Sequence, residues 1–244
     1  MENIVFLPLG SYEQHGKILP NNTDNVICEY ICSQVAANYI NSTILPGLTY
    51  GLSSEHIGIG QTITLSINTY INLLQDIIAC IPKSFPSCKL IVLINGHGGN
   101  QSLASAVCAN NNYLGDLPKT IILHVFPEST KRLATKLLGD FNAHADSVET
   151  SVYAAISKKI KDKMYNLEEL NEVSVRKHKL SLFPSRDISK TGIITSDTNI
   201  IIDNSIGEML IDNSIKAIIN EINKNIELIE EEITNGNCVR SYAK

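Results

Sequence analysis

Apolar residues occur along this chain in unbroken runs and seldom alternate with polar ones. Such runs make up most of residues 3–9, 89–94 and 120–126, the last of which His124 interrupts, and glycine, proline or polar residues follow each of them. A short apolar run bounded by turn residues is typical of a strand buried on both faces, as in a parallel sheet. We therefore predict strands at these three places, and a shorter one over 42–45 that Pro46-Gly47 ends.

The segments between these strands carry apolar residues at helical spacing. From Ile67 to Ile81 they recur every three or four positions, and Pro82 is expected to stop this helix. Further helices are predicted over 24–39, 101–111, 133–138, 146–160 and 205–233. Thr23 or Asp24 is expected to cap the start of the first of these helices, and Ser205 the start of the last. Asn235-Gly236 is expected to close the last helix.

Strands that alternate with helices indicate an α/β fold with a mostly parallel sheet covered on both faces. At 244 residues the chain suits one large domain, so we predict a single three-layer α/β/α domain over 1–244. Two segments, 49–61 and 167–194, have weak periodicity. We expect the first to be a long functional loop and the second to be irregular.

A glycine-rich turn, Asn95-Gly96-His97-Gly98-Gly99-Asn100, connects the strand over 89–94 to the next helix. Ligands of open α/β sheets bind at the carboxyl ends of the strands, where this turn leaves His97. Its glycines allow backbone conformations closed to other residues and let a ligand approach the main chain. The alternative is a glycine turn with an incidental histidine, and a second histidine-bearing segment near the N-terminus weighs against it.

The polar segment after the first strand carries Glu13 and His15, which point to the same side of an extended chain. Asp24 follows at the start of a predicted helix. Together with a distant histidine they form a ligand set suited to zinc, manganese or iron. A carboxylate can bridge two such ions, and paired ions activate water and polarise a carbonyl. Taken singly, Asp24 is more often a helix cap, and Glu13 is more often a solvated loop charge.

Composition narrows the classes of function. The formal net charge is −5 and the pI is near 5.7, which argues against a nucleic-acid binder. The N-terminus lacks signal-peptide features, and no apolar run approaches the roughly 20 residues of a membrane span, so we expect a cytoplasmic protein without membrane contact. The cysteines show no zinc or redox spacing, and Cys28 and Cys32 are predicted to be buried free thiols.

Four motifs occur in order along most of the chain. They read LPLGSYEQHG with LP and TD over 7–24, YGLSSEH with TITL over 50–65, NGHGGN over 95–100, and HAD with ETS over 144–151. In this order they resemble the creatininase family of metal-dependent amidohydrolases, and 192–207 is a looser match to the family's tail. The resemblance implies a small-molecule amide substrate and a homo-oligomer built from dimers, with a hexamer as one form.

The resemblance also implies a metal centre. At the matching positions Glu13, His15, Asp24 and His97 correspond to metal ligands, and Asp24 corresponds to a carboxylate that bridges two ions. This implies one or two divalent metals for each subunit, with zinc, iron and manganese as the candidates. A binding protein that has lost catalysis and a purely structural subunit are the competing classes. Retention of every ligand type favours an enzyme.

Five further residues take their expected roles from the same resemblance. Glu149 is expected as an extra carboxylate, either as a ligand or as a proton acceptor from metal-bound water, with a structural carboxylate as the alternative. His144 is expected as the general acid, against a capping or core histidine. Glu55, His56 and Asn100 are expected to contact substrate, and for Glu55 and His56 the alternative is plain loop polarity.

Two departures bear on the substrate. The creatinine-hydrolysing branch of the family carries a glutamate ligand at the position of Gly99 and tryptophans around its substrate, whereas this chain has no Trp. The glycine form resembles the branches that deformylate a formylamino-pyrimidine nucleotide in riboflavin and deazaflavin biosynthesis or trim the mycofactocin precursor peptide. We expect cleavage of a small non-peptide amide C–N bond, first a formamide on a pyrimidine nucleotide, with creatinine hydrolysis and mycofactocin-type peptide trimming as alternatives.

Substrate choice is expected to lie in the loops, since family membership does not transfer it. A phosphate-bearing substrate would need an Arg or Lys from the irregular segment 167–194. Its basic residues are Arg176, Lys177, His178, Lys179, Arg186 and Lys190. Replacement of Arg176 or Arg186 is then expected to raise KM more than it lowers kcat. A solvated basic loop is the alternative.

Overall fold

The centre of the fold is a four-stranded sheet with the order β2-β1-β3-β4, in which all neighbouring strands are parallel. The computed structural model describes residues 3–114, 118–139 and 144–234. The strands of this sheet are β1 (Asn3–Leu9), β2 (Ser42–Ile44), β3 (Cys88–Asn95) and β4 (Lys119–His124). All four predicted strands are confirmed, but β4 ends at His124 and not at residue 126.

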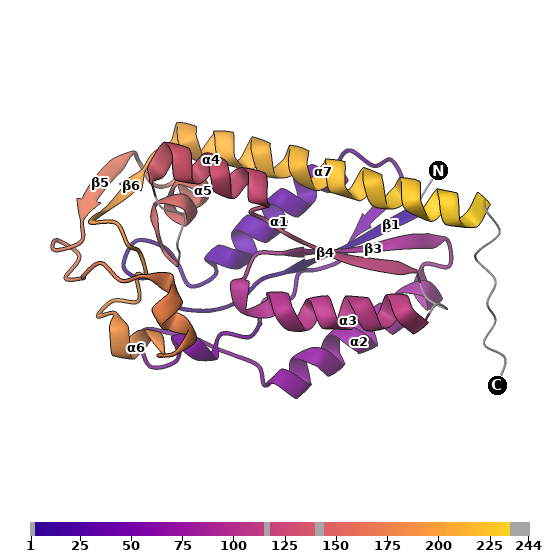
Figure 1. Cartoon of the computed structure of the whole chain (residues 1–244), viewed down its shortest axis with the longest axis horizontal. Coiled ribbons are helices and arrows are strands. Elements are labelled where there is room, and N and C mark those ends of the chain that lie inside the picture. Colours follow the sequence, from indigo (N-terminus) through magenta and orange to yellow (C-terminus); the bar gives the residue numbers. More distant parts are fainter. Residues whose placement is uncertain (1–2, 115–117, 140–143, 235–244) are drawn as a thin grey trace.

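Helices cover both faces of this sheet, which confirms the α/β fold (Figure 1). One face packs against α1 (Thr23–Ala36), α4 (Glu128–Leu138), α5 (Ser147–Ser157) and α7 (Asn204–Thr234), and the other against α2 (Ile67–Ser84) and α3 (Gln101–Leu114). Alternate residues of β1 serve the two cores: Ile4 and Phe6 face the first, and Val5 and Leu7 face the second. Full burial of such a side chain contributes about 1.5–3 kcal/mol, which explains the unbroken apolar runs.

The predicted cap residues of two helices are wrong. Thr23 and Asp24 lie inside the first turn of α1, because the Thr23 hydroxyl donates to Pro20 O and the Asp24 carboxylate accepts from Ser11 Oγ. Ser205 lies inside α7, and the Asp203 carboxylate caps this helix by accepting from Ile206 N–H. The expected closing pair of α7, residues 235 and 236, lies outside the described residues.

Helix lengths also differ from prediction. Pro82 does not stop α2, because the turn after it still closes through Phe85 N–H and Ile81 O, 2.7 Å apart. Helix α4 begins at Glu128, five positions before the predicted start, since Pro127 precedes it with an extended backbone suited to a helix start. Helix α3 extends to Leu114, past the predicted end at 111. Helix α5 ends at Ser157, before residue 160, because Lys158 takes a left-handed conformation with φ 55°.

A second, antiparallel sheet of two strands is absent from the prediction. It consists of β5 (Lys163–Asn166) and β6 (Asn199–Ile202), which flank the irregular segment. That segment holds two short helical turns, η3 (Lys177–Ser181) and α6 (Ser185–Ile188). The loop over 49–61 holds the turn η1 (Ser54–His56), and η2 (Gly98–Asn100) precedes α3.

Cys28 and Cys32 are confirmed as buried free thiols on α1. Within the described residues, no helix is long and apolar enough to cross a membrane.

Candidate metal centre

The carboxyl ends of three strands lie level with one another, and this register creates the site. In the ladders Leu9 pairs with Asn95, and Asn95 pairs with His124. The segment after β1 therefore delivers Glu13 and His15 to the same edge at which the segment after β3 delivers His97. Helix α1 starts at this edge too and adds Asp24 from its first turn.

Two groups of possible ligands share Asp24. In the first, His97 Nδ1 lies 3.2 Å from Glu13 Oε2 and 3.1 Å from Asp24 Oδ2. In the second, His15 Nε2 lies 3.1 Å from Asp24 Oδ1 and 3.8 Å from Glu149 Oε2. The ligand atoms of each group lie within 4.8 Å of one another. The Asp24 carboxylate thus faces both groups and presents one oxygen to each.

Each histidine in these groups has its ring orientation fixed by a backbone carbonyl. His15 Nδ1–H donates to Glu13 O over 3.1 Å, and His97 Nε2–H donates to Leu52 O over 2.7 Å. Because a carbonyl oxygen only accepts hydrogen bonds, the proton of the neutral ring sits on that nitrogen. The other nitrogen then carries a lone pair toward the carboxylates. Metal-bound histidines are oriented in this way by their outer hydrogen bond.

The charges of the cluster also fit a cation. Glu13 and Asp24 are almost fully buried, and Glu13 Oε2 has no hydrogen-bond donor among the described residues. Although burial opposes a charged imidazole, Asp24 raises the pKa of His15 to about 10, and Glu13 and Asp24 raise the pKa of His97 well above its usual value. The cluster therefore attracts positive charge, and carboxylates with imidazoles are the donors that zinc, manganese and iron accept.

Glu149 comes to the cluster on the first turn of α5. The Asp146 carboxylate caps this helix by accepting from Val148 N–H and Glu149 N–H. Glu149 Oε2 also accepts from Ala145 N–H over 2.6 Å. Burial raises the pKa of Glu149 to about 8, so in the protein without metal this carboxyl group keeps its proton at neutral pH.

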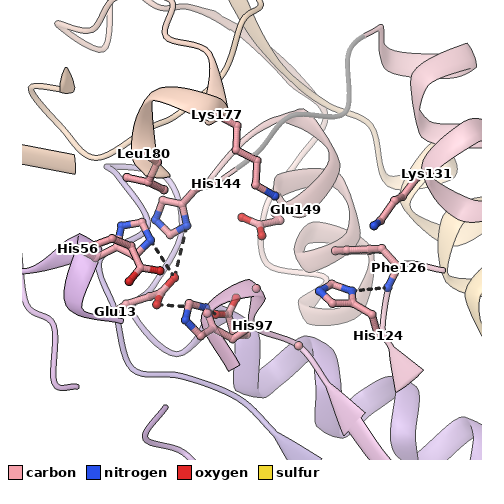
Figure 2. A pocket seen from close by; sticks show the side chains of 15 residues that line it. Glu13, His56, His97, His124, Phe126, Lys131, His144, Glu149, Lys177 and Leu180 are labelled. Carbon is pink, nitrogen blue, oxygen red and sulfur yellow. Dashed lines mark hydrogen bonds and ion pairs between the residues drawn. The ribbon is translucent and has the colours of Figure 1, made fainter. Parts of the chain in front are cut away.

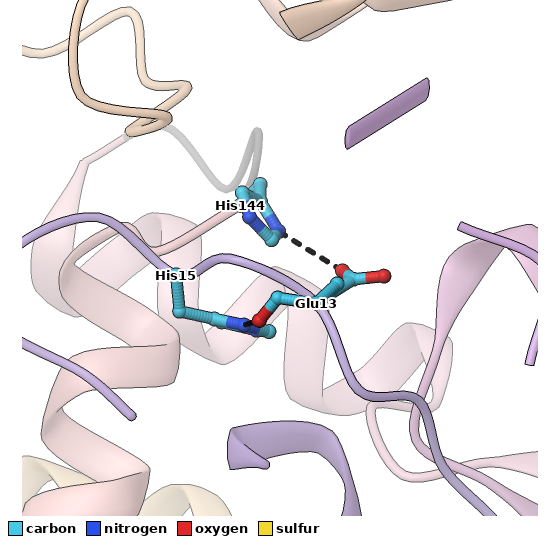
Figure 3. Close-up of side chains that lie close together, drawn as sticks. All are labelled: Glu13, His15 and His144. Carbon is cyan, nitrogen blue, oxygen red and sulfur yellow. Dashed lines mark hydrogen bonds and ion pairs between the residues drawn. The ribbon is translucent and has the colours of Figure 1, made fainter. Parts of the chain in front are cut away.

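His144 and His56 stack over the other side of Glu13, with ring centroids 4.0 Å apart (Figure 2), and Figure 3 shows His144 turned toward Glu13. His144 Nε2–H donates to Gln14 O over 2.6 Å, while its Nδ1 lies 3.4 Å from Glu13 Oε1. Gln14 Nε2 donates to His56 Nδ1 over 3.0 Å, so His56 presents Nε2–H to Glu13. Burial lowers the pKa of both histidines, and both rings are therefore neutral.

A cavity of about 150 Å³ opens beside this cluster. Of the predicted site residues, seven line it: Glu13, Asp24, Glu55, His56, His97, His144 and Glu149. His15 lies behind them, against Asp24. Asn100 does not line the cavity, since its amide accepts from Leu52 N–H and donates to Gly10 O. It holds the loops together, and a contact of Asn100 with substrate is not supported.

Gly99 lies against the backbone of the loop over 49–61. A Cβ at this position would overlap Leu52 O and would also reach His97 Nε2 and Glu55 Oε1. A side chain at position 99 would therefore displace the loop that carries Glu55. This close approach is the physical reason for the glycine form of the turn.

The cavity also contains residues that sequence reasoning missed. His124, Phe126 and Lys131 line it together with Lys177. The signal for His124 was present, because it ends a strand at the same edge as His97, whereas Lys131 on α4 follows no pattern. Among the basic residues of segment 167–194, the cavity lining includes Lys177 and excludes Arg176 and Arg186. Arg186 instead donates to Ile57 O over 3.1 Å.

A family model described as creatinine amidohydrolase matches residues 1–222 of this chain. The chain belongs to the creatininase family. Among solved members of this family, a mutant creatininase superposes with a TM-score of 0.71 at 21% identity and covers 91% of each chain. Other solved structures that share the fold are described as a Zn–Zn type creatininase and as creatininase with Mn.

Proteins similar in sequence to this chain are named for different activities. The mycofactocin precursor peptide peptidase of Mycolicibacterium smegmatis is 30% identical over 162 residues, which are 64% of this chain and 59% of that protein. The creatinine amidohydrolase of Pseudomonas putida is 32% identical over 102 residues, 40% of this chain and 38% of that protein. This chain thus matches well under two thirds of the length of either relative.

A third relative is matched along nearly its whole length. The 2-amino-5-formylamino-6-ribosylaminopyrimidin-4(3H)-one 5'-monophosphate deformylase of Methanobrevibacter ruminantium is 24% identical over 236 residues, which are 93% of this chain and 92% of that protein. The names of the three relatives describe different substrates. Family membership therefore leaves the substrate of this chain open.

Proposed function

We propose that this protein is a metal-dependent hydrolase that cleaves an amide C–N bond of a small molecule. The observation that carries the proposal is the pair of ligand groups that share Asp24 at the edge of the cavity. Glu13 and His97 would complete one ion site, and His15 and Glu149 the other. Two divalent ions in such a cluster activate water and polarise an amide carbonyl.

The residues around Glu13 would supply the proton transfers. His144 is neutral and directs its Nε2 proton to Gln14 O, so Nδ1, which faces Glu13, is the nitrogen that can accept a proton. As a general acid, His144 must first take a proton at Nδ1 from the attacking water and then deliver it to the leaving nitrogen. Histidine suits both halves of this transfer, and the Gln14 carbonyl keeps the ring aligned meanwhile.

For the substrate we propose a formamide, with the formylamino-pyrimidine nucleotide as the first compound to test. The near full-length match to the deformylase supports it, as do the glycine at position 99 and the absence of Trp. At about 150 Å³ the cavity is smaller than the roughly 300 Å³ at which drug-sized pockets begin. This supports a small acyl group inside the cavity, with the rest of a larger substrate extending out of it.

The test combines metal analysis with an amide panel. Purified protein is expected to carry one or two equivalents of zinc, iron or manganese, and Glu149→Gln is expected to lose one ion site while the group around Glu13 remains. Glu168→Gln, an exposed change outside the cavity, is the matched control. The panel contains the formylamino-pyrimidine nucleotide, creatinine and short peptides, each assayed with the three metals.

The outcomes separate the alternatives. Release of formate from the nucleotide supports the proposal. If creatinine or a peptide is turned over faster, that compound takes the place of the formamide as the proposed substrate. Protein that neither carries nor takes up a transition metal would be a binding or structural protein, and the proposal would be abandoned.

A further inference from the structure

The cavity has a second end that the metal centre does not use. Figure 2 shows His124 at the end of β4, Lys131 reaching in from α4 and Lys177 reaching in from η3. These three side chains come from separate elements that converge on one space. The metal end presents carboxylates and imidazoles, whereas this end presents two ammonium groups beside a neutral ring.

His124 offers a hydrogen-bond donor to this space. Its Nδ1 accepts from Phe126 N–H over 3.0 Å, so the proton of the ring sits on Nε2. Burial, together with the charges of Lys131 and Lys177, lowers the pKa of His124 to about 3. The ring is therefore neutral, and its Nε2–H points away from Phe126 into the cavity (Figure 2).

The charge of Lys177 is not neutralised by a direct ion pair. In residues 3–114, 118–139 and 144–234 no carboxylate lies within ion-pair distance of its ammonium group. Figure 2 shows the Glu149 carboxylate beside it, and Asp146 is near enough to feel its charge. The Asp146 carboxylate is already engaged as the cap of α5. Two lysines and an N–H donor around one small space form a site for a negatively charged group.

We propose that His124, Lys131 and Lys177 form an oxyanion-binding site, which holds a carboxylate or a phosphate of the substrate while its amide lies on the metal centre. The inference rests on the proposed function for the amide and adds the charge class of the substrate. It also selects Lys177 from the basic residues of its loop, because that side chain lines the same cavity as Glu149.

The test measures binding without turnover. Three ketones that lack a C–N bond to cleave serve as probes: levulinate carries a carboxylate, (3-oxobutyl)phosphonate carries a phosphonate, and 2-hexanone, of similar length, is neutral. Each is titrated into metal-loaded protein by calorimetry. At least one anion is expected to bind about tenfold more tightly than 2-hexanone, and the anion with the larger advantage identifies the group.

Variants locate the anion. Lys177→Met and Lys131→Met are each expected to cut the advantage of the anion about three- to tenfold and to leave the affinity for 2-hexanone unchanged. Lys179→Met and Lys136→Met are the matched controls, because these exposed lysines lie on η3 and α4 outside the cavity lining. Both controls are expected to keep the full advantage. Metal content is measured in every variant.

Three results would overturn the proposal: equal binding of the three ketones, an anion advantage that survives both cavity substitutions, or an equal loss in the control variants. The second result would mean that the anion lies on the metals. A failure of the proposed function is different. In that case the lysine-dependent preference is observed, but no amide in the hydrolysis panel is cleaved.

Discussion

The two ends of the cavity are built in different ways. At the metal end, Glu13, Asp24 and His97 are buried and come from segments next to β1 and β3 and from the first turn of α1. At the other end, Lys177 is exposed on a short turn within segment 167–194. The first end is fixed by the sheet, whereas the second adds a loop residue, Lys177, to His124 of β4 and Lys131 of α4. We infer that the chemistry belongs to the fold and that substrate choice belongs to the loop.

The largest expected effect comes from breaking the metal end at its centre. Asp24→Asn replaces the carboxylate that faces both ligand groups with an amide, which is a poorer bridge between two cations. Loss of an outer-shell partner alone costs about 10- to 100-fold in affinity or activity, so loss of this ligand is expected to cost more than about 100-fold. Metal content by elemental analysis and amide turnover measure it. Full metal occupancy in this variant would contradict the assignment of Asp24.

An intermediate effect concerns pH. Although burial opposes its charge, His15 has a pKa of about 10 in the folded protein, against about 6.5 when unfolded. Burial raises the pKa of Glu149 to about 8, against about 4.5. The folded protein therefore binds more protons than the unfolded chain between pH 6.5 and 10, and its stability falls as pH rises through this window.

Thermal melting of metal-free protein at pH 6.5 and pH 9 tests this expectation. The melting temperature should be lower at pH 9, and His15→Gln should flatten the dependence while Lys177→Met at the loop end should leave it in place. Added zinc should remove most of the loss, since the metal takes the place of the proton. A melting temperature that rises between these pH values would show that the metal end does not hold these protons.

The smallest expected effect concerns the support of the loop. Glu172 is buried, and its Oε2 accepts from Ser189 Oγ, Thr191 N–H and Thr191 Oγ1. Glu172→Gln weakens these bonds and loosens the segment that carries Lys177, at a cost of roughly 1 kcal/mol in substrate binding. KM is expected to rise about three- to tenfold with metal content unchanged. Steady-state kinetics measures it, with Glu168→Gln as control, and a loss of metal would mean that the two ends are not independent.

This division also explains what the sequence could predict. The strands before Gly10 and Asn95 are unbroken apolar runs, so their places and the ligand positions that follow them could be predicted from local patterns. Helix boundaries could not, because Thr23 and Asp24 have side-chain partners outside their helix. The end of the cavity with Lys131 and Lys177 could not be predicted from the sequence either. Lys131 and Lys177 are 46 residues apart in sequence and meet through tertiary packing that no periodicity encodes.

Asn100 has a consequence for the order of folding. Its amide joins Gly10, 90 residues away, to Leu52, 48 residues away. These bonds can form only after β1 has found β3, which is a pairing of distant segments and therefore slow compared with local helix formation. The ligands of the centre are separated along the chain in the same way. A metal ion is thus expected to enter a protein whose sheet is already folded, and to act late as a lock on the native state and not as a nucleus for its formation.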